Sequence, residues 1–260
     1  MYKESEIREG LETTVFGQGE IHIYTETDST NNKAYSLAED LSPEGTIVLA
    51  EYQNAGRGRM GRTWVSVPGK SISLSIILRP PVTPDSAPGI TLVMAVALSD
   101  TLREFGIHNH SIKWPNDILI NNRKISGILT ELKMYGSRIG FVIAGMGINT
   151  GPVKDSLPEE LKPFASSIYD ETGISIERLP FLRKLLKNIE AAYFDYLKSG
   201  LDALLPRWRD NSDIFGKRVS ALKEGEAVEG TVRGICGDGS LEIETADGEV
   251  KITSGEITLL

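Results

Sequence analysis

Three arginines stand close together in one short, glycine-rich segment of this sequence. The segment reads Gly56-Arg57-Gly58-Arg59-Met60-Gly61-Arg62-Thr63-Trp64, in a chain whose formal net charge is -8. Guanidinium groups at this spacing repel one another, and glycine raises the entropic cost of ordering a loop. An anionic ligand would offset both costs, because a guanidinium group binds phosphate or carboxylate oxygens two at a time. The segment is therefore predicted to bind an anion; the alternatives are a solvated loop and a nucleic-acid-binding segment.

A second cluster joins a cation, an aromatic ring, an amide and a carboxylate in the run Lys113-Trp114-Pro115-Asn116-Asp117. The carboxylate of Asp117 could hold Mg²⁺ while the ammonium group of Lys113 faces a phosphate. The alternative is a surface turn. For Trp114 a place in the core is the preferred interpretation.

Three further segments carry weaker signals. Lys124 precedes Gly127, whose missing side chain permits a close backbone approach, so the pair predicts either an anion site or an ordinary hairpin surface. Gly145-Met146-Gly147-Ile148-Asn149 could lie beside a nucleotide at a strand end, although a structural turn is the simpler interpretation. Asp28-Ser29-Thr30-Asn31 is predicted to cap a helix.

The composition is ordinary for a globular protein, with 40% hydrophobic and 25% charged residues among 260. Cys236 is the only cysteine, which excludes an intrachain disulfide and a thiolate metal cage. The acidic net charge disfavours nucleic acid or an anionic membrane as a partner. No apolar run is long enough to span a bilayer, and the N-terminus lacks the apolar core of a signal peptide, so a cytoplasmic location is expected.

The hydrophobic pattern predicts an α+β fold. Strands are expected near residues 20–24, 46–52, 71–78, 111–133 and 141–145, with 71–78 half-buried and Asn121-Asn122 as a tight turn. Helical spacing marks residues 31–38, 90–105 and 182–197. Short β runs from about Lys217 predict a small barrel or sandwich. We expect an N-terminal extension of residues 1–20, a main domain of 21–212 and a C-terminal domain of 213–260.

Taken together and in this order, these segments resemble the biotin protein ligase family. The resemblance is carried by Asp28-Ser29-Thr30-Asn31, Ala50-Glu51-Tyr52-Gln53 with the arginine segment, Lys113-Trp114-Pro115-Asn116-Asp117, Lys124 to Glu131, and Gly145 to Asn149. It is strong over residues 21–149 and weaker as far as Gly255-Glu256-Ile257-Thr258. It implies a mixed β-sheet flanked by helices, like that of class II aminoacyl-tRNA synthetases, with a C-terminal SH3-like barrel.

The resemblance implies a ligase that uses ATP and Mg²⁺ in two steps. Biotin and MgATP give biotinyl-5′-AMP and pyrophosphate, and a lysine of a biotin carboxyl carrier protein then receives the biotinyl group. A homodimer is also implied. Some relatives carry an N-terminal winged helix that represses biotin genes. Because residues 1–20 are too few for such a unit, we expect ligase activity without operator binding.

The resemblance also assigns residues to the two ends of the ligand. At the ureido and ring end of biotin it places Ser29, Thr30, Asn31 and Gln53, together with the loop residues Gly56, Arg57, Gly58 and Arg59. Arg59 and Arg62 are assigned to the adenylate phosphate and to holding the loop shut, and Trp64 to packing the closed loop.

At the nucleotide end, Lys124 is expected to bridge the biotin carboxylate and the α-phosphate, beside Asn116 and Gly127. Lys113 and Asp117 are assigned to ATP and Mg²⁺, and Asn149 is expected near the nucleotide. Lys124, Arg59 and Asp117 are the expected catalytic residues. Biotin's carboxylate is already ionised at neutral pH, so the first step needs charge neutralisation and no strong base.

Two other functions are compatible with parts of this pattern. A lipoate or octanoate ligase or transferase shares the fold and the acylation of lysine, but the arginine segment favours biotin. Cys236 is expected to be a buried thiol in the small C-terminal domain, which disfavours a cysteine nucleophile. A non-catalytic biotin or nucleotide sensor is disfavoured because both Lys113 and Lys124 are kept.

Overall fold

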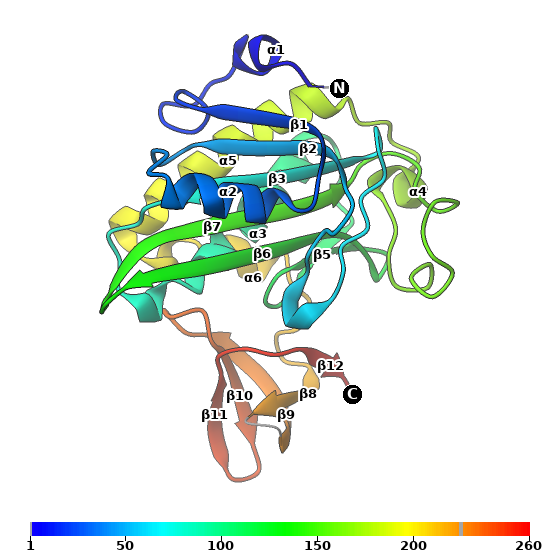
Figure 1. Ribbon diagram of the computed structural model, residues 1–260. Helices are drawn as coiled ribbons and strands as arrows, with labels where there is room; N and C mark the ends of the chain where they lie inside the picture. Colours follow the sequence, from blue (N-terminus) through cyan, green and yellow to red (C-terminus); the bar gives the residue numbers. More distant parts are fainter. Residues whose placement is uncertain (1, 224–225) are drawn as a thin grey trace.

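The computed structural model describes residues 2–223 and 226–260, and it is built around a seven-stranded mixed sheet (Figure 1). The sheet contains β1 (Ile21–Thr27), β2 (Ile47–Gln53), β3 (Ser71–Leu78), β4 (His110–Lys113), β5 (Asp117–Ile120), β6 (Arg123–Tyr135) and β7 (Arg138–Asn149). The strand order is β1-β2-β3-β7-β6-β5-β4, with β1 and β2 parallel and the other pairs antiparallel. β3 and β7 are therefore neighbours in space although they are far apart in the sequence.

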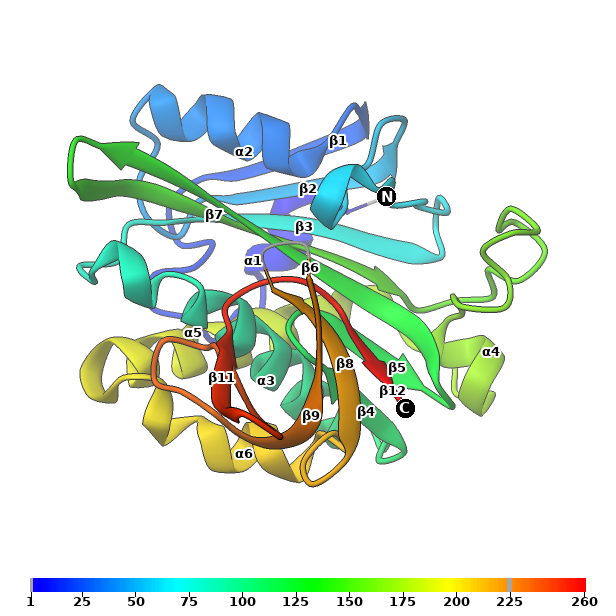
Figure 2. The same cartoon turned by 90° about the horizontal axis from the view of Figure 1, so that it is seen from below.

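Helices cover both faces of this sheet (Figure 2). One face carries α2 (Thr30–Glu39), and the other carries α3 (Gly89–Glu104) and α5 (Arg178–Ser199). The shorter helices are α1 (Glu4–Arg8), α4 (Ile168–Thr172) and α6 (Leu205–Asp210), with 3₁₀ turns η1 (Arg59–Gly61), η2 (Pro84–Ser86) and η3 (Leu201–Ala203). Nearly every residue of α3 is buried, because this helix lies between the sheet and α5.

The prediction that residues 71–78 form a half-buried strand was wrong about the burial. All eight residues of β3 are buried. The strand lies in the middle of the sheet, so both of its faces are covered. The serines of β3 point to one face of the sheet, and the aliphatic residues between them point to the apolar core on the other face. Neither face is exposed to solvent.

Two expectations about loops have different outcomes. The tight turn at Asn121-Asn122 is confirmed, because both residues have positive φ values, of 51° and 61°. The glycine-rich run from Gly145 to Asn149 is not a turn, because β7 continues through it to its last residue. The reason is that other side chains pack directly onto these glycines.

The N-terminal residues pack against α5. Tyr2, Ile7 and Phe16 are buried. The Glu190 carboxylate of α5 accepts hydrogen bonds from the backbone N–H groups of Thr14, Val15 and Phe16. A carboxylate with three backbone donors fixes this segment on the helix. In the part of the chain that the structure describes, no helix is both long and apolar enough to cross a membrane.

The C-terminal residues form a second, antiparallel sheet of five strands below the first (Figure 1). These are β8 (Arg218–Lys223), β9 (Glu226–Ile235), β10 (Leu241–Thr245), β11 (Gly248–Ile252) and β12 (Ile257–Leu259), in the order β11-β10-β9-β8-β12. The prediction of a mixed, helix-flanked sheet with a small C-terminal β domain is confirmed; closure of that domain into a barrel remains a prediction. Trp114 is buried as predicted, and its indole donates a hydrogen bond to Gly239 O (3.0 Å) in this domain. Cys236 is only partly buried, contrary to expectation.

Candidate active site

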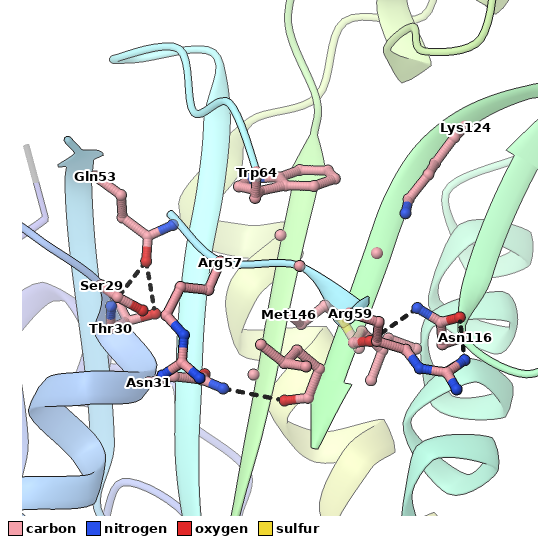
Figure 3. Close-up of a pocket in the computed structure, with 16 residues that line it drawn as sticks. Ser29, Thr30, Asn31, Gln53, Arg57, Arg59, Trp64, Asn116, Lys124 and Met146 are labelled. Atoms are coloured by element: carbon pink, nitrogen blue, oxygen red, sulfur yellow. Dashed lines mark hydrogen bonds between the residues drawn. The ribbon is translucent and has the colours of Figure 1, made fainter. Parts of the chain in front are cut away.

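The floor of the site is formed by glycines of β7, on the face of the main sheet that carries α2. Figure 3 shows the labelled side chains around this floor. A methyl carbon added at Gly145 would lie 1.9 Å from Asn31 Oδ1, and one at Gly147 would lie 2.2 Å from Trp64 Cε2. Both distances are far below van der Waals contact. The two glycines of β7 therefore allow Asn31 and Trp64 to reach the backbone of the sheet, which explains why a glycine-rich run stays in a strand.

A neutral polar cluster lies at one end of this floor. Gln53 Oε1 accepts hydrogen bonds from the Thr30 backbone N–H (2.7 Å) and hydroxyl (3.1 Å). The Ser75 hydroxyl lies 2.8 Å from Thr30 Oγ1 and 2.7 Å from Asn31 Oδ1. Ser29 occupies the predicted N-cap position of α2, but its side chain makes no capping hydrogen bond in the structure as described and instead lines the cavity. The predicted position of the helix cap is therefore confirmed, but the hydrogen bond typical of such a cap is not made.

The three arginines of the glycine-rich segment diverge. Arg57 donates to Asn32 Oδ1 and to Glu131 Oε1, each at 2.6 Å. Arg59 donates to Asn116 Oδ1 at 3.0 Å.

Arg62 turns away and pairs with Glu256 of the C-terminal domain, on an exposed surface. The hydrogen bond from Arg62 lowers the pKa of the Glu256 carboxyl below its ordinary value. Only two of the three guanidinium groups thus border the glycine floor, so the segment does not form one three-arginine anion site.

Arg59 is the arginine best placed for an incoming anion. Burial lowers the pKa of Arg59 below its ordinary value, although the negative charges of Asp117 and Glu256 oppose the shift. A guanidinium group stays charged in spite of such a shift. Its charge is therefore incompletely solvated, and an anionic ligand would restore the missing interactions.

A cationic cluster lies at the other end of the floor. Lys124 Nζ lies 2.7 Å from Asp117 Oδ1 and 5.9 Å from the centroid of the Trp64 ring. This ion pair satisfies Asp117 Oδ1, an otherwise buried atom. Lys113 is the cross-strand partner of Asp117. Asn149 is buried, and its amide bonds to Ser71 Oγ and Ser166 O, so it anchors the loop after β7 to β3.

Three adjoining cavities meet at Arg59. The glycine-floored cavity has a volume of only about 40 Å³, because Arg57 and Trp64 lie over it. A second cavity of about 380 Å³ lies between the N-terminal end of α3, β6 and the C-terminal domain. A third, of about 560 Å³, extends from Trp64 and Lys124 to the loop after β7. The two larger volumes are in the range of small-molecule sites.

Most of the predicted site residues meet at the small cavity. It is lined by Ser29, Thr30, Asn31, Gln53, Arg57, Gly58, Arg59, Trp64, Asn116, Lys124 and Gly127. The third cavity brings in Arg62, Lys113, Asp117 and Asn149. Gly56 lines neither, and a methyl group there would lie 2.4 Å from Trp64 O, so this glycine permits a close backbone turn.

Glu131 and Ser75 take part in the site although no role was predicted for either. Glu131 binds Arg57 through Oε1 and the Asn31 amide through Oε2, and so joins the loop to α2. Ser75 supports both Thr30 and Asn31. The alternating serines of β3 were the signal that could have identified Ser75.

Comparison with known proteins identifies the family of this chain. Residues 24–149 match the profile of the biotin/lipoate A/B protein ligase family, and residues 214–260 match the biotin protein ligase C-terminal domain. The bifunctional ligase/repressor BirA of Bacillus spizizenii is 40% identical over 258 residues, which cover 98% of this chain and 78% of the relative. This chain belongs to the biotin protein ligase family. The resemblance predicted from the motifs is confirmed.

Other members of the biotin protein ligase family are similar over nearly their whole length. The biotin–[acetyl-CoA-carboxylase] ligase of Mycobacterium tuberculosis is 29% identical, over 99% of this chain and 95% of that protein. Among solved structures, the biotin protein ligase from Aquifex aeolicus in complex with biotin and ATP superposes with a TM-score of 0.80 at 30% identity, covering 93% of this chain and 98% of that one.

Proposed function

We propose that this biotin ligase forms biotinyl-5′-AMP from biotin and ATP and then transfers the biotinyl group to a lysine of a biotin carboxyl carrier protein. One observation carries the proposal: a neutral polar cluster and a cationic cluster lie at opposite ends of one glycine floor (Figure 3). Biotin has the matching asymmetry, with a neutral ureido ring at one end and a carboxylate at the other. The neutral donors and acceptors of Thr30, Asn31 and Gln53 suit the ureido group, and Lys124 suits the carboxylate.

The first step joins two anions, so its barrier is largely electrostatic. A carboxylate oxygen of biotin bonds to the α-phosphorus of ATP, and pyrophosphate leaves with the electron pair of the broken P–O bond. Lys124 and Arg59 supply fixed positive charge where negative charge concentrates. Lys124 must exchange its contact with Asp117 for the ligand, and that ion pair is partly exposed, so the exchange costs little.

The residues at the cationic end are compatible with Mg²⁺ delivered by ATP. Mg²⁺ typically uses one or two carboxylates together with substrate phosphates, and the Asp117 carboxylate becomes available when Lys124 turns from it to the ligand. No group of three or more His, Cys, Asp or Glu residues that could hold a metal ion occurs in residues 2–223 and 226–260, which fits an ion held mainly by phosphate. When bound, Mg²⁺ would neutralise phosphate charge.

The second step transfers the acyl group to nitrogen. The carrier lysine attacks the carbonyl carbon of the mixed anhydride, the C–O bond breaks, and AMP leaves. The attacking amine loses one proton, and we assign Asp117 to accept it because its carboxylate lies beside Lys124 at the reacting end. Closure of the arginine segment over the anhydride would exclude water and protect it from hydrolysis.

Further parts of the proposal concern partners and organisation. We propose that the protein acts in the cytoplasm as a homodimer, and that it does not bind operator DNA, for which the net charge of -8 is unfavourable. The boundaries 1–20, 21–212 and 213–260 are kept as the proposed division of the chain. A mobility-shift titration with a biotin-operator fragment tests the absence of DNA binding, and a specific shift would contradict it.

The decisive experiment is incubation with MgATP, biotin and a carrier domain, with lipoate as a competitor, followed by intact-mass measurement. We expect the mass of one biotinyl group on the carrier and none of a lipoyl group. Biotin-dependent exchange of labelled pyrophosphate into ATP tests the first step separately. A protein that binds biotin without exchange would be a sensor, and lipoyl transfer would indicate the related lipoate activity.

A further inference from the structure

The loop after β7, residues 150–167, forms one wall of the third cavity. Leu157, Leu161, Phe164 and Ala165 of this loop line the cavity. Ordering a connection of this length costs conformational entropy, so contacts with the rest of the protein must hold it in one conformation. Two side chains of α4, the short helix that follows the loop (Figure 2), provide such contacts.

Asp170 of α4 holds the beginning of this loop. Its Oδ2 atom accepts hydrogen bonds from the backbone N–H groups of Val153 (2.9 Å) and Lys154 (3.1 Å). The hydroxyl of Ser167, at the other end of the loop, donates to the same oxygen at 2.9 Å. Hydrogen bonds to a carboxylate are stronger than those between neutral groups. One charged oxygen thus joins the two ends of the loop.

Glu171, the next residue of α4, holds the end of the loop on the β5–β6 hairpin. Its side chain is 1% exposed. Oε1 accepts a hydrogen bond from the Ser166 hydroxyl and lies 2.6 Å from Nη2 of Arg123, the first residue of β6. Oε2 accepts a hydrogen bond from the side-chain amide of Asn121, in the turn before β6 (3.1 Å). These partners offset the cost of burying the charge, and they come from two segments far apart in the sequence.

The end of the loop also pairs with the backbone of Lys124. The Lys124 N–H group donates to Phe164 O (2.8 Å), and Lys124 O accepts from the Ser166 N–H group (2.9 Å). This parallel bridge places the loop beside β6 at the residue that carries the reacting cation. Because Arg123 and Ser166 flank the bridge and both contact Glu171, that carboxylate fixes the wall of the cavity relative to Lys124.

We propose that Asp170 and Glu171 are positioning residues for the use of ATP, because they hold the loop after β7 as a fixed wall of the third cavity. Neither side chain lines any of the three cavities of the described chain, so both act through the loop and not on the ligand. This inference rests on the proposed function, since it takes ATP as the ligand of the third cavity, where Lys113 and Lys124 supply positive charge. A wall that is in place before ATP arrives does not have to be ordered at the expense of binding.

The test compares Glu171→Gln with the matched control Glu190→Gln. Both glutamates fix a loop segment on a helix, but the segment held by Glu190 lines none of the three described cavities. Pyrophosphate exchange gives KM for ATP and for biotin, and thermal unfolding gives the melting temperature. We expect Glu171→Gln to raise KM for ATP about threefold to tenfold and to leave KM for biotin within about twofold. Glu190→Gln should lower the melting temperature and leave both KM values within about twofold.

A second variant reports on the loop directly. Asp170→Ala removes the acceptor at the beginning of the loop, where Lys154 is exposed. Trypsin cleaves after lysine unless proline follows, so Lys154 is a cleavage site and Lys162, which precedes Pro163, is not. We expect cleavage after Lys154, identified by intact mass, to be at least about fivefold faster in Asp170→Ala than in the wild-type protein, because local opening exposes the backbone to the protease.

Two results would overturn the positioning role. One is a KM for ATP in Glu171→Gln that is unchanged or rises no more than in Glu190→Gln. The other is cleavage of Asp170→Ala at the wild-type rate. Absence of biotin-dependent exchange in the wild-type protein would instead refute the proposed function, and the proteolysis would still test the contacts of the loop.

Discussion

The substitution Gly147→Ala examines the packing on which the site depends. In a strand, alanine is favoured over glycine by about 0.5–1 kcal/mol through backbone entropy. Here the added carbon would lie 2.2 Å from Trp64 Cε2 and 2.6 Å from Cζ2, inside a rigid ring. Overpacking of this kind costs about 1–3 kcal/mol, so we expect a net destabilisation of about 1–2 kcal/mol and displacement of the indole from the floor.

Displacement of the indole should impair function more than stability. Because Trp64 borders both the small cavity and the third cavity, biotin-dependent pyrophosphate exchange should fall about tenfold or more, equivalent to about 1.4 kcal/mol in the barrier. Gly237→Ala is the matched control, since this glycine is exposed and the nearest atom would be 3.8 Å away. Wild-type stability together with wild-type exchange in Gly147→Ala would show that the indole does not rest on Gly147 in the working enzyme.

Three further substitutions test other contacts. Lys124→Gln removes a cation at the reacting end and should slow pyrophosphate exchange about 10²–10³-fold. If the exchange rate of this variant stays within about threefold of the wild-type rate, Lys124 has no catalytic role in the first step. Arg62→Ala breaks an exposed ion pair with Glu256 and should change the unfolding free energy by less than about 1 kcal/mol, an effect that high salt abolishes. Burial by itself would raise the pKa of Glu51, but the hydrogen bond and charge of Arg178 outweigh it and hold that pKa below its ordinary value. Stability from this pair is therefore complete above the ordinary pKa of 4.5 and is lost as the pH falls through the lower folded pKa, so the advantage of wild type over Glu51→Gln in urea denaturation should shrink on acidification. A difference that stays constant with pH would assign the effect to packing.

Local patterns were enough to locate the main elements. The long helix predicted over residues 182–197 is found within α5, and the strand predicted over 46–52 is β2, because both patterns follow the period of the backbone itself. The same patterns could not say what covers each face. Residues 71–78 show a period of two whether the polar face meets water or a binding site, so the burial of β3 was predicted wrongly.

The sequence by itself determined the family of this protein and the residues available for its chemistry. The arginine–glycine segment, the cluster around Asp117, and Lys124 can each be recognised from short stretches of the chain. Only the tertiary structure decided the partners of those groups. Arg57 meets Glu131, and Arg62 meets Glu256 in another domain, through contacts between residues far apart in the chain. The pairing of β3 with β7 likewise places Ser73 beside Gly147. Short-range sequence fixes dihedral preferences and charge, whereas such pairings are set by strand order and register, which depend on how the whole core packs.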